Sequence, residues 1–254
     1  MKRSLNEVER ICRKAAEGAG APAGLDTDAA DGAAWLLARD LPALNGLAGD
    51  LTGFPDLAAA CRFARGSFGG AEELDLNGKA CTVIAPMLVD LLVARAARNA
   101  EPSRLRATGL SSPLFLLPPA VGHAAQGHND RGWSFNLSLS NGTGERSILR
   151  VAAGGEVEIL ATGGTIAALF EAGTDWVLEA VCASLETDEL SRTDLPSIVD
   201  GERLDALAMR SLAEGVSPDP GPWGRLQALA AKVLVPATEQ SHLMGAGALG
   251  SDSE

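Results

Sequence analysis

Two histidines lie close together in a polar, glycine-containing stretch of the chain. His123 and His128 are followed by Asn129, Asp130 and Arg131. Imidazole and carboxylate groups can bind metals or transfer protons, and a guanidinium can bind an acidic ligand. We expect this stretch to be a loop beside a strand, where binding groups are often found. The five-residue separation of the histidines is not a helical ligand spacing, so solvated loop histidines remain the alternative and no metal is assigned.

A second group of polar side chains lies near the end of the sequence. Glu239, Ser241 and His242 precede a glycine-rich segment at 245–250. The glycines would permit close approach to a ligand or to another chain. Ser241 and His242 are too close in sequence to act as nucleophile and base, because catalytic triads are built from distant segments. This group is therefore either part of a ligand pocket or a docking tail.

Residues 159–167 read Ile-Leu-Ala-Thr-Gly-Gly-Thr-Ile-Ala. They resemble the N-terminal active-site signature of bacterial-type L-asparaginases, and the resemblance implies that Thr165 is a nucleophile. In that family the motif follows the first strand of an α/β domain, and a tyrosine helps to activate the threonine. This chain has no tyrosine, and its Gly-Thr-Asp at 173–175 lacks the preceding histidine of the family's second element. A Gly-Gly turn after an apolar strand explains the same letters, and we favour that interpretation.

The four cysteines are far apart in the sequence, with no CxxC pair and no spacing typical of zinc sites. They are Cys12, Cys61, Cys81 and Cys182. We expect them to be reduced residues of the core, because a free cysteine is most often a small buried side chain. The sequence has no P-loop, no GxGxxG after a strand, no GxSxG and no HExxH. It therefore identifies no cofactor.

The candidate site residues described above must be positioned by helices at both ends of the chain and by strands between them. Ser4 and Glu7 form a capping-box pattern, which predicts a helix that ends near Gly20. Alanines and leucines at helical spacing predict a second helix that starts near Asp26 or Thr27, and Pro55 suits the start of a third. We expect residues 1–75 to be the helical part of the molecule.

The middle of the chain is rich in residues that favour strands. Residues 81–84 read as a short strand before a helix opened by Pro86, and residues 112–117 as a buried strand. From Trp133 to Ser140 apolar and polar residues alternate, so one face of that strand is buried and the other wet. Asn141-Gly142 predicts a hairpin turn, and further strands are expected at 148–151, 157–160 and 176–182.

Helical spacing returns after residue 190, around Leu204 and again after Pro222. Helices in separate blocks around an antiparallel sheet are typical of an α+β fold rather than an alternating α/β fold. We therefore predict a central, largely antiparallel sheet, a meander of hairpins over about 105–182, packed with N-terminal and C-terminal helices. We expect a single domain over 1–254, with a helical part at 1–75 and a sheet-centred part at 76–254.

The first forty residues resemble a known bacterial family. Leu-Asn-Glu-Val-Glu at 5–9, Ala-Ala-Glu-Gly-Ala-Gly at 15–20 and a helix reaching Trp35-Leu36 are similar to the domain-of-unknown-function family 3726. The family pattern has an aromatic residue before Gly24, where this chain has Ala23. The resemblance implies a bacterial protein but brings no established activity.

The composition of the chain argues against two classes of function. The chain has 254 residues and a formal net charge of −12, with 4% aromatic residues. An acidic chain poor in aromatics argues against a nucleic-acid binder, and no apolar run is long enough to span a membrane. We expect a cytoplasmic small-molecule metabolic enzyme or enzyme component. The alternatives are a non-catalytic subunit that binds a partner and, less favoured, the amidohydrolase. Alanine-rich helices near both ends also predict a homo-oligomer.

Overall fold

The computed structural model describes residues 1–62, 73–98, 102–126, 132–162, 176–184 and 195–233. Its helices are α1 (Leu5–Ala19), α2 (Leu25–Ala38), α3 (Leu44–Gly53), α4 (Leu57–Ala60), α5 (Cys81–Arg98), α6 (Leu117–Gln126), α7 (Gly201–Glu214) and α8 (Pro220–Ala230), with 3-10 turns η1 (Pro113–Leu116) and η3 (Ala231–Val233). Its strands are β1 (Glu73–Asp75), β2 (Ser103–Leu110), β3 (Trp133–Asn141), β4 (Arg146–Val151), β5 (Val157–Ala161), β6 (Trp176–Ser184) and β7 (Ser197–Val199). No helix in these ranges is both long and apolar enough to cross a membrane.

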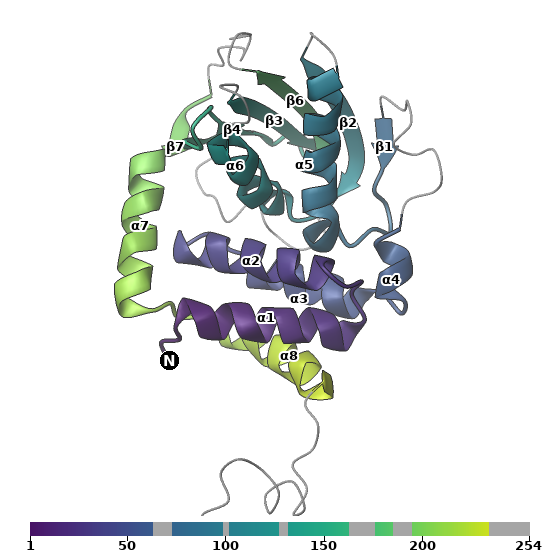
Figure 1. Cartoon of the computed structure of the whole chain (residues 1–254), viewed down its shortest axis with the longest axis vertical. Helices are drawn as coiled ribbons and strands as arrows, with labels where there is room; N and C mark the ends of the chain where they lie inside the picture. Colours follow the sequence, from purple (N-terminus) through teal and green to yellow (C-terminus); the bar gives the residue numbers. More distant parts are fainter. Residues whose placement is uncertain (63–72, 99–101, 127–131, 163–175, 185–194, 234–254) are drawn as a thin grey trace, which may run out of the picture.

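The N-terminal helices form a layer below the sheet, together with α8 (Figure 1). The predicted cap of α1 is confirmed, because the Ser4 hydroxyl accepts a hydrogen bond from the Glu7 amide and Gly20 ends the helix with a φ of 88°. Only half of the capping box forms, since the Glu7 carboxylate binds Arg3 instead, at 2.7 Å. Helix α3 was not predicted, because its glycines at 46, 49 and 53 weaken the helical pattern.

The central sheet has seven strands in the order β1-β2-β6-β3-β4-β5-β7. β1 and β2 are parallel, and the other neighbours are antiparallel. The predicted α+β fold with a largely antiparallel sheet is therefore confirmed. β3, β4 and β5 follow one another as hairpins, as predicted, but β6 returns to lie between β2 and β3. The sheet is thus not a simple meander.

The two faces of the sheet differ in chemistry. Phe135, Leu137 and Leu139 of β3 are buried on the face that packs under α5 and α6, together with apolar residues of the other strands. The opposite face, called the outer face below, carries the alternate residues Ser134, Asn136, Ser138 and Ser140 and their cross-strand partners. The predicted alternation is confirmed, although Ser134 and Asn136 are each only 8% exposed.

Two predicted strands are helical in the structure. Residues 81–84 form the first turn of α5, and Pro86 lies inside that helix instead of opening it. Residues 113–117 are buried as expected, but they form η1 and the start of α6. Short apolar runs do not distinguish a strand from a buried helix, because both hide every side chain. The consequence for the predicted site is that His123 lies on a helix and not in a loop.

Buried residues of the helical layer and of the sheet belong to one hydrophobic cluster. α5 joins them, because it contacts α2 and α3 as well as β2 and β6. α7 lies at one side of the molecule (Figure 1), with only Gly201 and Leu204 buried. The organisation of residues 1–254 as a single domain stays a prediction.

Candidate functional site

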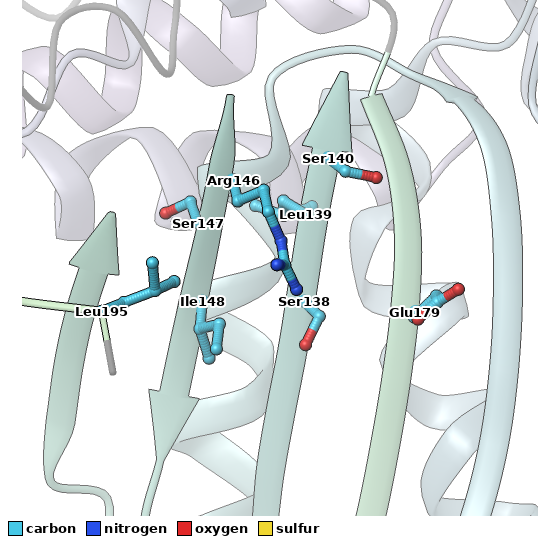
Figure 2. A pocket seen from close by; sticks show the side chains of 8 residues that line it. All are labelled: Ser138, Leu139, Ser140, Arg146, Ser147, Ile148, Glu179 and Leu195. Carbon is cyan, nitrogen blue, oxygen red and sulfur yellow. The ribbon is translucent and has the colours of Figure 1, made fainter. Parts of the chain in front are cut away.

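The outer face of the sheet contains a pocket of about 240 Å³. Its described lining is Ser138, Leu139, Ser140, Arg146, Ser147, Ile148, Glu179 and Leu195. Figure 2 shows these residues on β3, β4 and β6, with Leu195 at the far side of β4. The pocket therefore combines hydroxyl groups, one guanidinium and one carboxylate with apolar side chains, which are the components of a site for a small polar ligand.

Strand register brings these residues together. Ser140 of β3 pairs with Arg146 of β4, and Ser138 pairs with Ile148 of β4 on one side and with Glu179 of β6 on the other. Directly paired residues point to the same face of a sheet. Arg146 on β4 and Glu179 on β6 therefore lie on either side of β3, which carries the two serines.

The guanidinium of Arg146 is the strongest binding group in the pocket. It is exposed and has neither an ion pair nor a hydrogen bond with any described residue. Figure 2 shows its side chain running from β4 toward Ser138. Arg150, two residues further along β4, differs in this respect because its Nη1 atom binds Glu158 of β5 at 2.6 Å. Arg146 is thus available to a ligand, whereas Arg150 is occupied within the protein.

Ser138 has a defined hydrogen-bonding direction. Its hydroxyl donates to the Oδ1 atom of Asn136, at 3.3 Å, on the same face of β3. A hydroxyl that uses its proton in this way keeps its oxygen as an acceptor. The middle of the pocket therefore favours a ligand group that donates a hydrogen bond.

His123, the predicted site residue that the structure describes, lies elsewhere. Its Nε2 atom is 2.7 Å from Oδ1 of Asp90, which links α6 to α5. These two helices cover the face of the sheet opposite the pocket. The His123–Asp90 pair could transfer protons, but it is not part of the outer-face pocket. In the described ranges no three side chains of the metal-ligating types come close enough to hold an ion.

The other predicted site residues lie outside the described residues. These are His128, Asn129, Asp130, Arg131, Thr165, Glu239, Ser241 and His242. The strand before Thr165 is described, and β5 is antiparallel to both β4 and β7. This arrangement differs from the parallel α/β setting that the asparaginase resemblance implies.

Arg146 and Glu179 were not predicted as site residues. The alternation in β3 identified Ser138 and Ser140 as polar-face residues, and this was the available signal. Arg146 and Glu179 join them through strand pairing, with Glu179 more than thirty residues away in the sequence. Pairing of that kind cannot be derived from local spacing.

A second polar centre lies between α3, α5 and the end of β2. The Oδ2 atom of Asp50 accepts hydrogen bonds from the backbone amide and the hydroxyl of Thr82, at 2.8 and 2.9 Å. Ser111 donates to its Oδ1 atom at 3.5 Å. Burial raises the pKa of Asp50 to about 6, and the hydrogen bonds from Thr82 and Ser111 act against this rise. Because Thr82 and Ser111 already donate hydrogen bonds to this carboxylate, we infer that Asp50 stabilises the start of α5 and does not bind a ligand.

The four cysteines are buried, as predicted. Burial raises the pKa of Cys12 and of Cys182 to about 12, and that of Cys61 to about 11. A thiol becomes a good nucleophile when its pKa is lowered. Their burial and raised pKa values are those of cysteines that pack in the core.

The fold is that of a group of solved dehydrogenases and reductases. The chain is similar to a dehydrogenase from Sinorhizobium meliloti (14% identity, TM-score 0.59), with 91% of this chain and 99% of that one covered. It is also similar to malate dehydrogenase from Pyrococcus horikoshii (10%, TM-score 0.58, 94% and 97% covered) and to delta1-piperideine-2-carboxylate reductase from Pseudomonas syringae (14%, TM-score 0.51, 90% and 99% covered). At such identities the likeness shows a shared fold.

Residues 3–74 match the family model described as protein of unknown function (DUF3726). The predicted resemblance of the N-terminal segment is thereby confirmed, and the match extends through α1, α2, α3 and α4 to β1. Among curated proteins no sequence matches this chain.

Proposed function

We propose that this protein is a small-molecule metabolic enzyme that binds a small carboxylic acid in the outer-face pocket. The observation that carries the proposal is the guanidinium of Arg146, which has no partner among the described residues and lies in a pocket of about 240 Å³. Arginine binds carboxylates through two parallel hydrogen bonds, because its planar fork of N–H groups matches the two carboxylate oxygens.

The surroundings of Arg146 support a small ligand rather than a large one. Ser138 and Ser140 supply hydroxyl groups on the floor of the pocket, and Ile148 and Leu195 supply apolar contacts. Such a lining can orient a few polar atoms and cover a short carbon chain. Catalysis needs further groups that hold or move a proton, and Glu179 is the titratable carboxylate among the described lining residues.

The similar structures support the same ligand class by analogy. One is named a malate dehydrogenase and another a delta1-piperideine-2-carboxylate reductase, so both names contain a small carboxylic acid. An analogy at the level of the fold is weak on its own, because one fold supports many reactions. The guanidinium of Arg146 in the pocket fits the same class of ligand.

Thermal unfolding with a panel of small acids tests the proposal. A ligand at one hundred times its dissociation constant stabilises a protein by about 2.7 kcal/mol. For a chain of this size, that corresponds to a rise in Tm of roughly 5–10 °C. We expect one or more of lactate, malate, pyruvate, alanine and proline to raise the Tm in a dose-dependent way.

Two arginine variants locate the binding site. Arg146→Gln should abolish the rise in Tm, because it removes the group that binds the carboxylate. Arg104→Gln is the matched control, since Arg104 is an exposed arginine of β2 on the same sheet face and outside the pocket lining. If no acid stabilises the wild-type protein, or if Arg146→Gln responds as the wild type does, the proposal is wrong.

Two alternative functions from the sequence analysis, an assembly subunit and an amidohydrolase, remain predictions. A non-catalytic assembly subunit should copurify with an unrelated chain and show no response to the acids. The amidohydrolase should release ammonia from asparagine and lose this activity in Thr165→Ala. The expected homo-oligomer also stays a prediction, which size-exclusion chromatography at several micromolar concentrations can check.

A further inference from the structure

Glu179 lies on the opposite side of Ser138 from the strand that carries Arg146. It is an exposed residue of β6 and pairs in register with Ser138 of β3. Its carboxylate has no ion pair or hydrogen bond within the described ranges. Arg106, its register partner on β2, pairs instead with Glu73 of β1. The described lining of the pocket thus contains one guanidinium and one carboxylate, and neither has a partner among the described residues.

These two charges do not neutralise each other. β4 and β6 are separated by β3, so their backbones are about 10 Å apart, which is two interstrand spacings. On the same face, Arg150 and Glu158 lie on adjacent strands and form an ion pair at 2.6 Å. The pocket of about 240 Å³ that both side chains line leaves room for a small molecule, with Ser138 and Ser140 beneath it.

We propose that the ligand is a zwitterion, an amino acid or cyclic imino acid whose carboxylate binds Arg146 and whose protonated nitrogen binds Glu179. This inference rests on the proposed function and adds that the bound acid carries a protonated nitrogen. Charge-assisted hydrogen bonds of roughly 2.8 Å at each end would join the two side chains through the ligand's own short skeleton. A hydroxy acid could form an ion pair with Arg146 only, because its hydroxyl group can donate one hydrogen bond but carries no positive charge.

Ser138 supports a nitrogen at the middle of the pocket. Its proton is used by Asn136, so its oxygen accepts hydrogen bonds. A protonated amine has several N–H groups and can donate to Ser138 and to Glu179 at the same time. A second carboxylate in this place would meet the negative charge of Glu179. The pocket should therefore prefer an amino acid to a hydroxy acid of the same shape, and should bind dicarboxylates least well.

Matched ligand pairs test this inference by calorimetry on the intact protein. Alanine is compared with lactate, and proline with tetrahydrofuran-2-carboxylate, because the members of each pair differ mainly at the nitrogen. We expect the nitrogen-containing member to bind at least about tenfold more tightly, as a charged hydrogen bond contributes that much. Glu179→Gln should remove this preference and leave binding of the oxygen analogue almost unchanged.

The controls separate a failure of this inference from a failure of the proposed function. Glu156→Gln changes an exposed glutamate in the turn before β5 and should behave as the wild type. Arg146→Gln should weaken both members of each pair. Unfolding curves of the unliganded variants verify that each variant is folded, as expected for exposed positions.

Three results would overturn the inference. Equal binding of both members of each pair to the wild type would exclude a selected nitrogen, while the acid-binding function would stand. A preference that persists in Glu179→Gln would exclude Glu179 as its cause. If no acid of either kind binds the wild type, the proposed function fails and this inference fails with it.

Discussion

The carboxylate of Asp50 and the backbone amide of Thr82 are joined by a buried hydrogen bond of 2.8 Å between α3 and the first turn of α5. The hydroxyl of Thr82 donates to the same oxygen atom. The first amides of a helix have no partner within the helix, and a side-chain oxygen can supply one. Here that oxygen comes from a different helix, so one carboxylate both caps α5 and attaches it to the N-terminal layer.

The stability of the protein should depend on pH through Asp50. Its pKa is raised from an ordinary value near 3.8 to about 6 in the folded state, so the folded protein binds this proton more tightly than the unfolded chain. The resulting stability is present below about pH 4 and is lost as the pH rises through 6. When it is fully present, this contribution to the free energy of unfolding is about 3 kcal/mol. Cys61 and Lys79 are the other titratable groups nearby, and burial raises the pKa of the Cys61 thiol to about 11, above this range.

Asp50→Asn should remove this pH dependence. Urea unfolding of the wild type and the variant between pH 4 and pH 7 measures it. The difference in unfolding free energy between the two proteins should change across this range, because only the wild type titrates at position 50. Parallel pH profiles would contradict the assignment.

Asp50→Ala should destabilise the protein more than a change at an ordinary cap. The variant leaves the buried amide and hydroxyl of Thr82 without a partner, which costs about 1–3 kcal/mol. Asp56→Ala is the matched control, because Asp56 caps the short helix α4 through the Ala59 amide at an exposed position. It should cost about 1 kcal/mol or less. Equal losses in chemical denaturation would show that Asp50 is an ordinary surface cap.

Gly46→Ala should destabilise α3, and Gly49→Ala should not. A Cβ atom at position 46 would clash with the Ser112 hydroxyl and lie 2.9 Å from its Cβ atom. Ser112 has a positive φ of 49°, so its backbone has little freedom to move away. Gly49 lies in the same helix with open space around it. We expect a loss of about 1–3 kcal/mol at 46 and a gain of up to about 1 kcal/mol at 49.

A second variant tests whether Ser112 causes that loss. Ser112→Gly removes the clashing side chain and suits the positive φ. In the Ser112→Gly background, Gly46→Ala should cost less than in the wild type, which a double-mutant cycle of unfolding free energies measures. An unchanged cost would place the clash elsewhere.

Cys12 and Cys182 should resist alkylation in the folded protein. Burial raises the pKa of both thiols to about 12, so their reactive thiolate forms are scarce at neutral pH. Mass spectrometry after iodoacetamide treatment should find these two residues unmodified under native conditions and modified in denaturant. Rapid native labelling of either would show that its surroundings open readily.

Several elements could be predicted because their signals are local. The Ser4 cap acts within one turn of α1, and the alternation from Trp133 to Ser140 reports one buried face within a single strand. The hairpin turn at Asn141-Gly142 depends on neighbouring residues as well. Residues 81–84 were wrongly predicted as a strand, because their helical form depends on the Asp50 cap and on packing against the N-terminal layer.

Composition and periodicity thus define the class of fold, the buried cysteines and the polar face of β3, since each depends on residues close together in the chain. The pairing of β3 with β6, which places Glu179 on the other side of Ser138 from β4 and Arg146, was decided by the tertiary structure. The same is true of His123, which contacts Asp90 on a neighbouring helix and lies away from the pocket. Contacts between distant segments form only when the whole core packs, so no local pattern of residues records them.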